Sequence, residues 1–253
     1  EKGNRPAVIL GTAGTVNTGA TDDLNALADI AAEEDLWLHI DGAFGALAAI
    51  SPNLSQTVRG MERADSLAFD LHKWMYLPFE IACLLVRDGD VHRAAFTQSA
   101  SYIAPSERGV IAGGLPFADL GIELTRGFKA LKAWMCLKSY GFDKMAALID
   151  QNVEQARLLA SLVEAHPELE LMAPVPLNVV CFRYKAPQDG VDRFNEEILY
   201  LIQERGIAVP SSTILNGAYC LRACFVNHRT KMEDVPDLVR AVVEIGREVE
   251  SKG

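Results

Sequence analysis

The chain has 253 residues, enough for one large α/β domain or two smaller ones. Hydrophobic residues make up 49% and charged residues 23%, which is typical of a globular rather than a disordered protein. The formal net charge is −10, and no run is rich in lysine or arginine. These features argue against a nucleic-acid or anionic-membrane partner, and no apolar run approaches the roughly 20 residues that span a bilayer.

The five cysteines are scattered and form neither a Cys-x-x-Cys pair nor a zinc-type Cys/His pattern. We therefore expect reduced thiols in the core of a cytoplasmic protein that binds no metal through them. No secretory signal sequence is recognisable. The chain starts at Glu1 and enters a strand within a few residues, so we expect it to be a piece of a longer protein.

Short apolar segments alternate with helical patterns in the first part of the chain. Residues 7–10, 36–40, 66–69 and 80–86 have the length and composition of buried strands, and an amphipathic helix follows the first of them. Strands that alternate with helices are typical of a layered α/β fold with a largely parallel sheet.

The second part of the chain has a different order of elements. Helical patterns cover residues 120–138 and 144–164, and beyond them we expect strands at 169–172, 179–184, 207–209 and 219–226 and helices at 191–205 and 235–249. This order predicts a small α+β domain. We place the boundary near residue 140, so that residues 1–140 include the helix joining the halves and residues 141–253 form the small domain.

Three segments with functional potential follow predicted strands. They are the glycine/threonine loop at 11–15, the segment 39–43 and the segment 70–74. Ligand sites of open α/β sheets lie at the carboxyl ends of the strands. Taken singly, each segment is better explained as a turn or a helix cap. The loop has neither the spacing of a dinucleotide fingerprint nor a phosphate-loop Gly-Lys-Ser/Thr, which argues against a nicotinamide-dependent dehydrogenase.

Lys73 and Asp41 give two of these segments a shared chemistry. Lys73 lies between His72 and Trp74 just past an apolar strand, where we expect it to line a buried pocket wall as a nucleophilic amine. Asp41 ends the neighbouring strand, where we expect a buried carboxylate beside a fixed cation. A buried amine and a buried carboxylate are what pyridoxal phosphate requires, because one forms a Schiff base and the other keeps the pyridine nitrogen protonated.

The motifs around these residues resemble those of the group II pyridoxal-phosphate-dependent amino-acid decarboxylases, the family of the aromatic-L-amino-acid, histidine and glutamate enzymes. The resembling pieces are Ala13–Gly14–Thr15 followed by Gly19, the run 37–43, and the run from Ala64 through Trp74. The resemblance is specific from Val8 to Arg87 and looser beyond. It implies a fold-type-I, transferase-like α/β fold, of which the chain holds part of the large domain and the small C-terminal domain.

Carried over position by position, the resemblance implies the roles of four residues around the cofactor ring. Lys73 is the Schiff-base lysine and Asp41 the partner of the pyridine nitrogen. Ala43 packs under the ring, where a larger side chain would clash. His72 lies beside the cofactor and is a catalytic candidate.

Two further cofactor contacts depart from the pattern of some relatives. The resemblance places Asp70 near the cofactor phosphate, where some relatives have asparagine. It places Thr15 in the loop that approaches the ring, followed by Val16 where some relatives have a second threonine. These departures weaken the expected contact of Asp70 with the phosphate and that of the glycine/threonine loop with the ring.

Three residues are candidates for handling the substrate. Tyr102 lies in a segment of mobile-lid composition at 97–109, and the resemblance implies that it returns a proton after carbon dioxide departs; a tyrosine that only packs is the alternative. Arg222 lies in an apolar strand, where a buried charge usually has an anionic partner, and the resemblance places it near the substrate carboxylate. For Arg126 a structural ion pair is an equal alternative.

The resemblance covers only about the second half of a family member. The other half would supply a dimerisation segment, a histidine that stacks on the ring and a Ser/Ala loop at the phosphate. The resemblance also implies a homodimer with a shared active site, so that this chain alone could be inactive.

The function we expect is removal of the α-carboxylate of an L-amino acid, in the style of bacterial aromatic-acid enzymes, to give an amine and carbon dioxide. Within the same chemistry the alternatives are an oxidative aldehyde synthase and a glutamate or other amino-acid decarboxylase. From another class, the chain could be a catalytically silent, truncated partner, although retention of both Lys73 and Asp41 argues against that.

Overall fold

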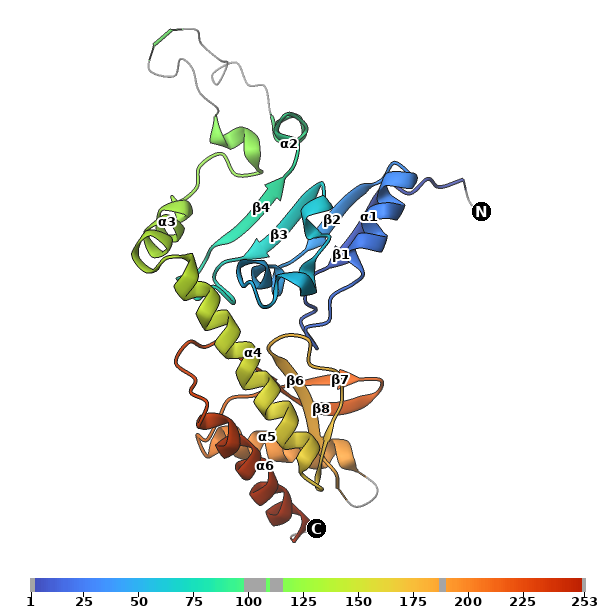
Figure 1. Ribbon diagram of the computed structural model, residues 1–253, viewed down its shortest axis with the longest axis vertical. Helices are drawn as coiled ribbons and strands as arrows, with labels where there is room; N and C mark the ends of the chain where they lie inside the picture. The colour runs from blue at the N-terminus through green and yellow to red at the C-terminus, as the bar shows by residue number, and fades with distance from the viewer. Residues whose placement is uncertain (1–2, 98–107, 110–115, 187–189, 252–253) are drawn as a thin grey trace.

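The computed structural model describes residues 3–97, 108–109, 116–186 and 190–251 and contains two four-stranded sheets (Figure 1). The first sheet lies in the N-terminal half and the second in the C-terminal half, and a long helix passes from one to the other. No helix in these ranges is long and apolar enough to cross a membrane.

The first sheet has the strand order β1-β2-β3-β4. Its members are β1 (Val8–Thr12), β2 (Trp37–Asp41), β3 (Ser66–Asp70) and β4 (Ala82–Val86). The first three are parallel, and β4 runs antiparallel to β3. The crossover between β1 and β2 contains helix α1 (Leu24–Glu33), which begins where the Asp23 carboxylate accepts a hydrogen bond from the Ala26 N–H. The expected α/β architecture is confirmed.

The two faces of this sheet differ. Leu38 and Ile40 of β2 point to one face and are buried against α1 and the 3-10 helices that follow β2. Side chains alternate along a strand, so Val8 and Leu10 of β1 point to the other face, where they are 58% and 59% exposed. Parallel sheets are normally covered on both faces, so this open face is unusual for its strand arrangement.

The helix expected at 120–138 is shorter at its start than predicted. The structure has a 3-10 turn at Phe117–Leu120, a non-helical stretch, and then α3 (Lys129–Tyr140). Two glycines, Gly121 and Gly127, flank the stretch and weaken any helix that would include them. Helix α2 (Gly89–Phe96) follows β4 and was not predicted; Asp88 caps it through the Asp90 and Val91 N–H groups.

The second sheet is antiparallel, with the order β5-β6-β8-β7. Its strands are β5 (Leu169–Leu171), β6 (Val179–Tyr184), β7 (Ser211–Leu215) and β8 (Ala218–Cys224), and helices α4 (Phe142–Ala165), α5 (Val191–Glu204) and α6 (Asp234–Glu250) pack with it. The predicted α+β order is confirmed.

One strand of this sheet was predicted in the wrong place. Residues 207–209 are not a strand, and β7 begins after Pro210. The reason is the hairpin turn at Asn216–Gly217, where both residues have positive φ, 51° and 83°. An Asn-Gly pair adopts the turn that joins two antiparallel strands directly, so it fixes β7 immediately before it and β8 immediately after it.

Helix α4 belongs to both hydrophobic cores. Met145, Ile149 and Val153 are buried in the core of the first sheet, whereas Leu159 and Val163 are buried in that of the second. One continuous helix therefore contributes to the cores of both halves.

Candidate active site

The three strand-end segments meet at one edge of the first sheet. Thr12 is opposite Asp41 in the β1–β2 register, and Asp41 is opposite Ala68 in the β2–β3 register. Because these strands are parallel, the glycine loop, Asp41 and Asp70 all lie at the carboxyl ends of their strands. This is where open α/β sheets bind ligands.

Backbone packing locks two of these segments together. The Ala13 N–H donates to the Asp41 carbonyl at 2.8 Å, and the Gly45 N–H donates to the Ala13 carbonyl at 3.0 Å. A Cβ atom on Gly45 would lie 2.6 Å from the Ala13 carbonyl oxygen, and one on Gly14 would lie 2.7 Å from the Gly45 Cα. Only glycine permits so close an approach, so both residues are needed for the shape of this edge.

Asp41 lies on the open face of the sheet and is exposed, so the expectation of a buried carboxylate was wrong. Its Oδ1 accepts a hydrogen bond from the Ala43 N–H at 3.0 Å. This contact turns the chain directly after β2 and leaves Ala43 half-buried beside the carboxylate. Asp41 is available to a ligand because nothing in the described residues covers this face above it.

Lys73 was also expected to be buried, and that was wrong. Its side chain is 43% exposed and its Nζ pairs with Asp70 Oδ2 at 2.6 Å. The next residues, Trp74 and Met75, are fully buried and hold the loop in place. The apolar neighbours in the sequence therefore anchor the loop and leave the amine at the surface, within reach of the carboxyl edge of the sheet.

His72 is fixed by the loop that leads to β4. Its Nδ1 lies 2.9 Å from the Ile81 carbonyl oxygen and 3.2 Å from the Ile81 nitrogen. The Phe79 ring packs edge-on against the imidazole at a centroid distance of 4.4 Å. These contacts place His72 beside Lys73 with a defined ring orientation.

Arg222 has partners other than those we expected. Its guanidinium donates to the Val16 carbonyl oxygen, at 2.9 Å from Nε, and to the Ser211 hydroxyl at 3.1 Å from Nη1. No carboxylate of the described residues pairs with it, and the substrate carboxylate that the resemblance gives it as a partner stays a prediction. A backbone carbonyl fills that place, and Arg222 thereby ties β8 to the glycine/threonine loop. In the same loop, the Thr15 and Thr18 hydroxyls lie 3.1 Å apart.

Of the two remaining candidates, Tyr102 and Arg126, the structure describes only Arg126. Tyr102 lies outside the described residues. Arg126 is exposed and donates a hydrogen bond to the Phe117 carbonyl, so its observed partner is backbone and not the ion pair weighed as its alternative.

A buried polar network behind Lys73 was not predicted. The Trp74 Nε1–H and the Tyr76 hydroxyl both donate to Asn152 Oδ1 of α4, at 3.2 and 2.5 Å. The Asn152 amide donates to Gln155 Oε1, and the Gln155 amide donates to the Thr230 carbonyl. Burial raises the pKa of the Tyr76 hydroxyl, which stays a donor. The signal in the sequence was the presence of two amides on the apolar face of α4.

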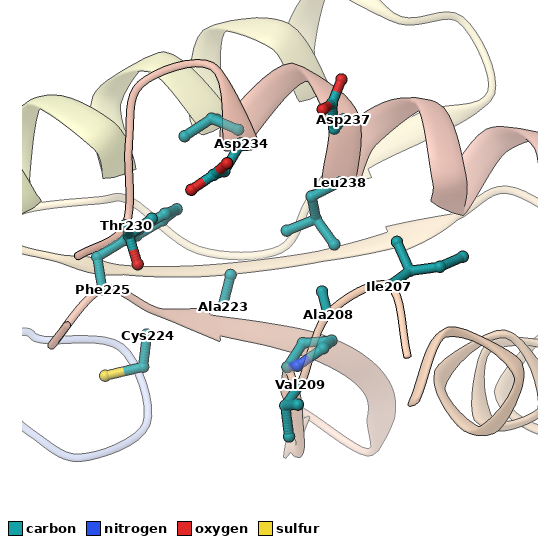
Figure 2. Close-up of a pocket in the computed structure, with 12 residues that line it drawn as sticks. Ile207, Ala208, Val209, Ala223, Cys224, Phe225, Thr230, Asp234, Asp237 and Leu238 are labelled. Atoms are coloured by element: carbon teal, nitrogen blue, oxygen red, sulfur yellow. The ribbon is translucent and has the colours of Figure 1, made fainter. Parts of the chain in front are cut away.

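A cavity of about 520 Å³ lies in the C-terminal half (Figure 2). It lies between β8 and α6 and is lined by apolar side chains such as Val209 and Phe225, with Asp234 and Asp237 at the helix. None of the strand-end residues lines this cavity. The described residues contain no cluster of three or more potential metal ligands, and all five cysteines are free.

The first sheet is mainly parallel, and the Lys73 amine and the Asp41 carboxylate lie where its strands end. These features define an α/β protein with a ligand site at the ends of its strands. Comparison with known proteins gives the family. The profile described as "Pyridoxal-dependent decarboxylase conserved domain" matches residues 1–185, and the chain belongs to that family. The resemblance seen in the motifs is confirmed.

Individual relatives agree with this assignment. The chain is 35% identical over 252 residues to an aromatic-L-amino-acid decarboxylase of Bacillus atrophaeus, covering 98% of this chain and 52% of the relative. It is 31% identical to tyrosine decarboxylase 4 of Petroselinum crispum, covering 88% and 45%. The chain thus spans about half the length of the curated relatives it matches.

Solved structures show the same fold. The tryptophan decarboxylase of Catharanthus roseus, solved in complex with L-tryptophan, is 28% identical with a TM-score of 0.86, covering 97% of this chain and 52% of that one. The Rhodiola rosea 4-hydroxyphenylacetaldehyde synthase is 26% identical with a TM-score of 0.84, covering 96% and 50%. The expected fold type is therefore confirmed.

Proposed function

We propose that this chain is the C-terminal half of a pyridoxal-phosphate-dependent carboxy-lyase that converts an L-amino acid to an amine and carbon dioxide. The observation that carries the proposal is the accessible Asp41 carboxylate and Lys73 amine at one sheet edge, in a chain of the pyridoxal-dependent decarboxylase family. The relatives named for aromatic amino acids, tyrosine and tryptophan support an aromatic substrate.

The residues at this edge fit pyridoxal phosphate. Asp41 is exposed, Lys73 is held by one ion pair, and Ala43 offers a small surface between the carboxylate and the rest of the turn. When bound, the cofactor supplies a ring that accepts the electron pair of the bond to the departing carboxylate. Asp41 holds a proton on the pyridine nitrogen, an interaction of about 4 kcal/mol at ~4 Å and an effective dielectric of ~20.

Lys73 would hold the cofactor at its aldehyde carbon, and for this its amine would give up a proton and its ion pair with Asp70. Because that pair is half-exposed, breaking it costs about 1 kcal/mol or less. His72 would border the cofactor, Asp70 would lie toward its phosphate, and Thr15 would approach the ring from the glycine loop.

Arg222 and Tyr102 act on the substrate in this proposal. The Arg222 guanidinium already lies at the glycine/threonine loop, and it exchanges a carbonyl partner for the substrate carboxylate. Tyr102 returns a proton to the carbon that lost its carboxylate. Product analysis separates this reaction from its alternative, because an amine with carbon dioxide indicates a decarboxylase and an aldehyde with ammonia and peroxide indicates a synthase like the Rhodiola relative.

The assembly is proposed from the same family. The protein is a cytoplasmic homodimer with a shared active site and a small L-amino acid as its substrate. Residues 1–140 belong to the large cofactor-binding domain and residues 141–253 form the small domain, with α4 packed on both cores.

Borohydride reduction in the presence of pyridoxal phosphate tests the proposal. We expect peptide mass mapping to find a pyridoxyl adduct on Lys73 and none at that position in Lys73→Ala. Lys185 is the control, since it is an exposed lysine directly after β6 in the C-terminal half. Equal labelling of Lys73 and Lys185 in the folded chain would contradict a specific site.

A further inference from the structure

The loop that carries Lys73 is held by its buried side chains more than by its backbone. The Lys73 N–H donates to the Asp70 carbonyl at 3.4 Å, and the Tyr76 N–H donates to the Lys73 carbonyl at 3.3 Å. Both distances exceed the roughly 2.7–3.2 Å that is usual for N–H···O hydrogen bonds. The residue directly after Lys73 is Trp74, whose side chain is fully buried. The position of the Lys73 amine therefore depends mainly on how the Trp74 ring is fixed.

Two contacts fix the Trp74 ring, and they come from different parts of the chain. The face of the indole stacks on the Phe44 ring at a centroid distance of 5.8 Å and an interplanar angle of 9°. Its Nε1–H donates to Oδ1 of the fully buried Asn152 of α4 at 3.2 Å. Stacked rings can slide and rotate against each other, whereas a directional hydrogen bond from the ring edge fixes the rotation. The two contacts together define the orientation of the indole.

Phe44 connects this anchor to Asp41. Phe44 is buried and lies in the turn after β2, in which Asp41 Oδ1 accepts the Ala43 N–H. Asp41 is three positions before Phe44, and Lys73 is one position before Trp74. The two groups that we assign to the cofactor are thus carried by segments that meet in one buried pair of aromatic rings.

The hydrogen bond between Trp74 and Asn152 contributes geometry more than stability. A buried pair of polar groups adds little net free energy, and apolar side chains of similar shape at both positions would be about as stable. What the polar pair adds is one fixed arrangement of the ring, because the buried N–H loses its acceptor in any other.

We propose that Trp74 is a positioning residue for Lys73, which holds the amine at the carboxyl edge of the first sheet by tying its loop to the Asp41 turn and to α4. The importance of this position for catalysis rests on the proposed function. The effect on Lys73 itself does not, because the ion pair of Lys73 with Asp70 belongs to the cofactor-free chain.

The carbon-13 resonance of the Asp70 carboxylate in the cofactor-free chain measures where the Lys73 amine lies. Lys73→Ala gives the resonance of an unpaired Asp70 and so sets the scale. Trp74→Phe removes the indole donor and part of the ring, and we expect it to move the Asp70 resonance more than halfway to the Lys73→Ala value. Tyr76→Phe is the matched control, because the Tyr76 hydroxyl donates to the same Asn152 oxygen, and we expect it to leave the resonance at the wild-type value.

A second control separates positioning from a general loss of stability. Phe182→Ala removes a whole buried ring from the core of the second sheet and should destabilise the chain at least as much as Trp74→Phe. We expect it to leave the Asp70 resonance unchanged while the chain is folded. If Trp74→Phe fails to fold, Asn152→Leu removes the acceptor instead, and we expect a shift that Tyr76→Phe lacks.

Borohydride reduction with pyridoxal phosphate gives a second readout. We expect the ratio of Lys73 labelling to Lys185 labelling to fall about tenfold in Trp74→Phe, because a reacting group misplaced by ~1 Å can lose up to about a hundredfold in rate. The ratio in Tyr76→Phe should stay close to that of the wild type.

The outcomes separate this inference from the proposed function. An Asp70 resonance that Trp74→Phe leaves at the wild-type value, or that Tyr76→Phe or Phe182→Ala shifts equally, would overturn the inference whether or not the cofactor binds. A shifted resonance with an unchanged labelling ratio would overturn it too, because the displaced amine would still reach the cofactor. The expected shift in a chain that is never labelled at Lys73 would support the inference and contradict the proposed function.

Discussion

The two sheets of this chain are stabilised to different degrees. In the second sheet, β6 is buried on both faces: helices α4 to α6 cover one side, and Phe44 of the N-terminal half packs with Val179 and Cys181 on the other. In the first sheet only one face is covered, and apolar side chains such as Leu10 are exposed on the other. The C-terminal half thus has a complete core, whereas the N-terminal half has a complete core on one side only.

The candidate site lies on the incompletely covered sheet. Asp41 and His39 belong to the open face of β2, and Lys73 leaves the sheet at the same carboxyl edge. An open polar edge can accept a ligand, while the closed second sheet holds Arg222 against the glycine/threonine loop. We therefore expect substitutions of site residues on the open face to change function with little loss of stability. We expect substitutions in the core of the closed sheet to change stability.

The largest expected effect is that of Asp41→Asn on catalysis. Replacing the carboxylate removes most of the ~4 kcal/mol attraction that keeps the pyridine nitrogen protonated, so turnover should fall by orders of magnitude. Because Asp41 is exposed, the free energy of unfolding should change by less than about 0.5 kcal/mol. Steady-state kinetics and urea unfolding measure the two quantities. Near-normal turnover would contradict the assigned role of Asp41.

Two core substitutions compare the sheets directly. Phe182 of β6 is fully buried, and Phe182→Ala should lower the free energy of unfolding by about 3–5 kcal/mol. Leu10→Ala removes an exposed side chain from the open face and should cost less than about 0.5 kcal/mol. Urea denaturation of both variants gives the difference. Similar losses would show that the open face is covered in solution, for example by a second copy of the chain.

How far the sequence predicts this molecule depends on whether the signal is local. Helices α4, α5 and α6 were predicted within a few residues because their apolar residues repeat with the helical period, and β7 was missed only because the Asn216–Gly217 turn was overlooked. The burial of Lys73 was wrong for a deeper reason. Buried neighbours do not determine where the lysine itself points, and its exposure depends on what covers the sheet edge.

Contacts between distant residues were beyond any local pattern. Arg222 donates to the carbonyl of Val16, which lies 206 positions earlier, and no feature of either segment identifies the other. Identifying the site was possible because its residues follow strands, and parallel strands bring their carboxyl ends together regardless of the details of packing.

Asn152→Leu tests the network that joins the two halves behind Lys73. The variant leaves the buried Trp74 N–H without its acceptor, while Tyr76 keeps the Leu148 carbonyl at 3.2 Å. We expect a loss of about 1–3 kcal/mol in the free energy of unfolding. Glu154→Leu, on the exposed side of the same helix, is the control and should change stability far less. Equal effects would indicate that helix packing, and not the network, joins the halves.

The smallest expected effect is a pH dependence confined to the closed sheet. Glu168 accepts two hydrogen bonds from Arg247, at 3.0 and 2.6 Å, and one from the Tyr184 hydroxyl at 2.8 Å. The Arg247 guanidinium, followed by Tyr184, lowers the pKa of the Glu168 carboxyl from 4.5 to about 2. A pKa that is lower in the folded state means that the ionised carboxylate stabilises the fold. This contribution is complete above about pH 4.5 and is lost as the pH falls toward 2.

Urea unfolding of the wild type and Glu168→Gln between pH 7 and pH 2.5 measures this contribution. The variant should be less stable at pH 7, by less than Asn152→Leu, because Glu168 is 27% exposed and solvent screens its ion pair with Arg247. The gap between wild type and variant should stay constant down to about pH 4.5 and close below it, since protonation makes the two side chains alike. A gap that stayed constant down to pH 2.5 would mean that Arg247 leaves Glu168 in solution, because the carboxyl would then have the same pKa in the folded and unfolded states. The closed sheet would in that case be looser at its helix α6 side than its buried core implies.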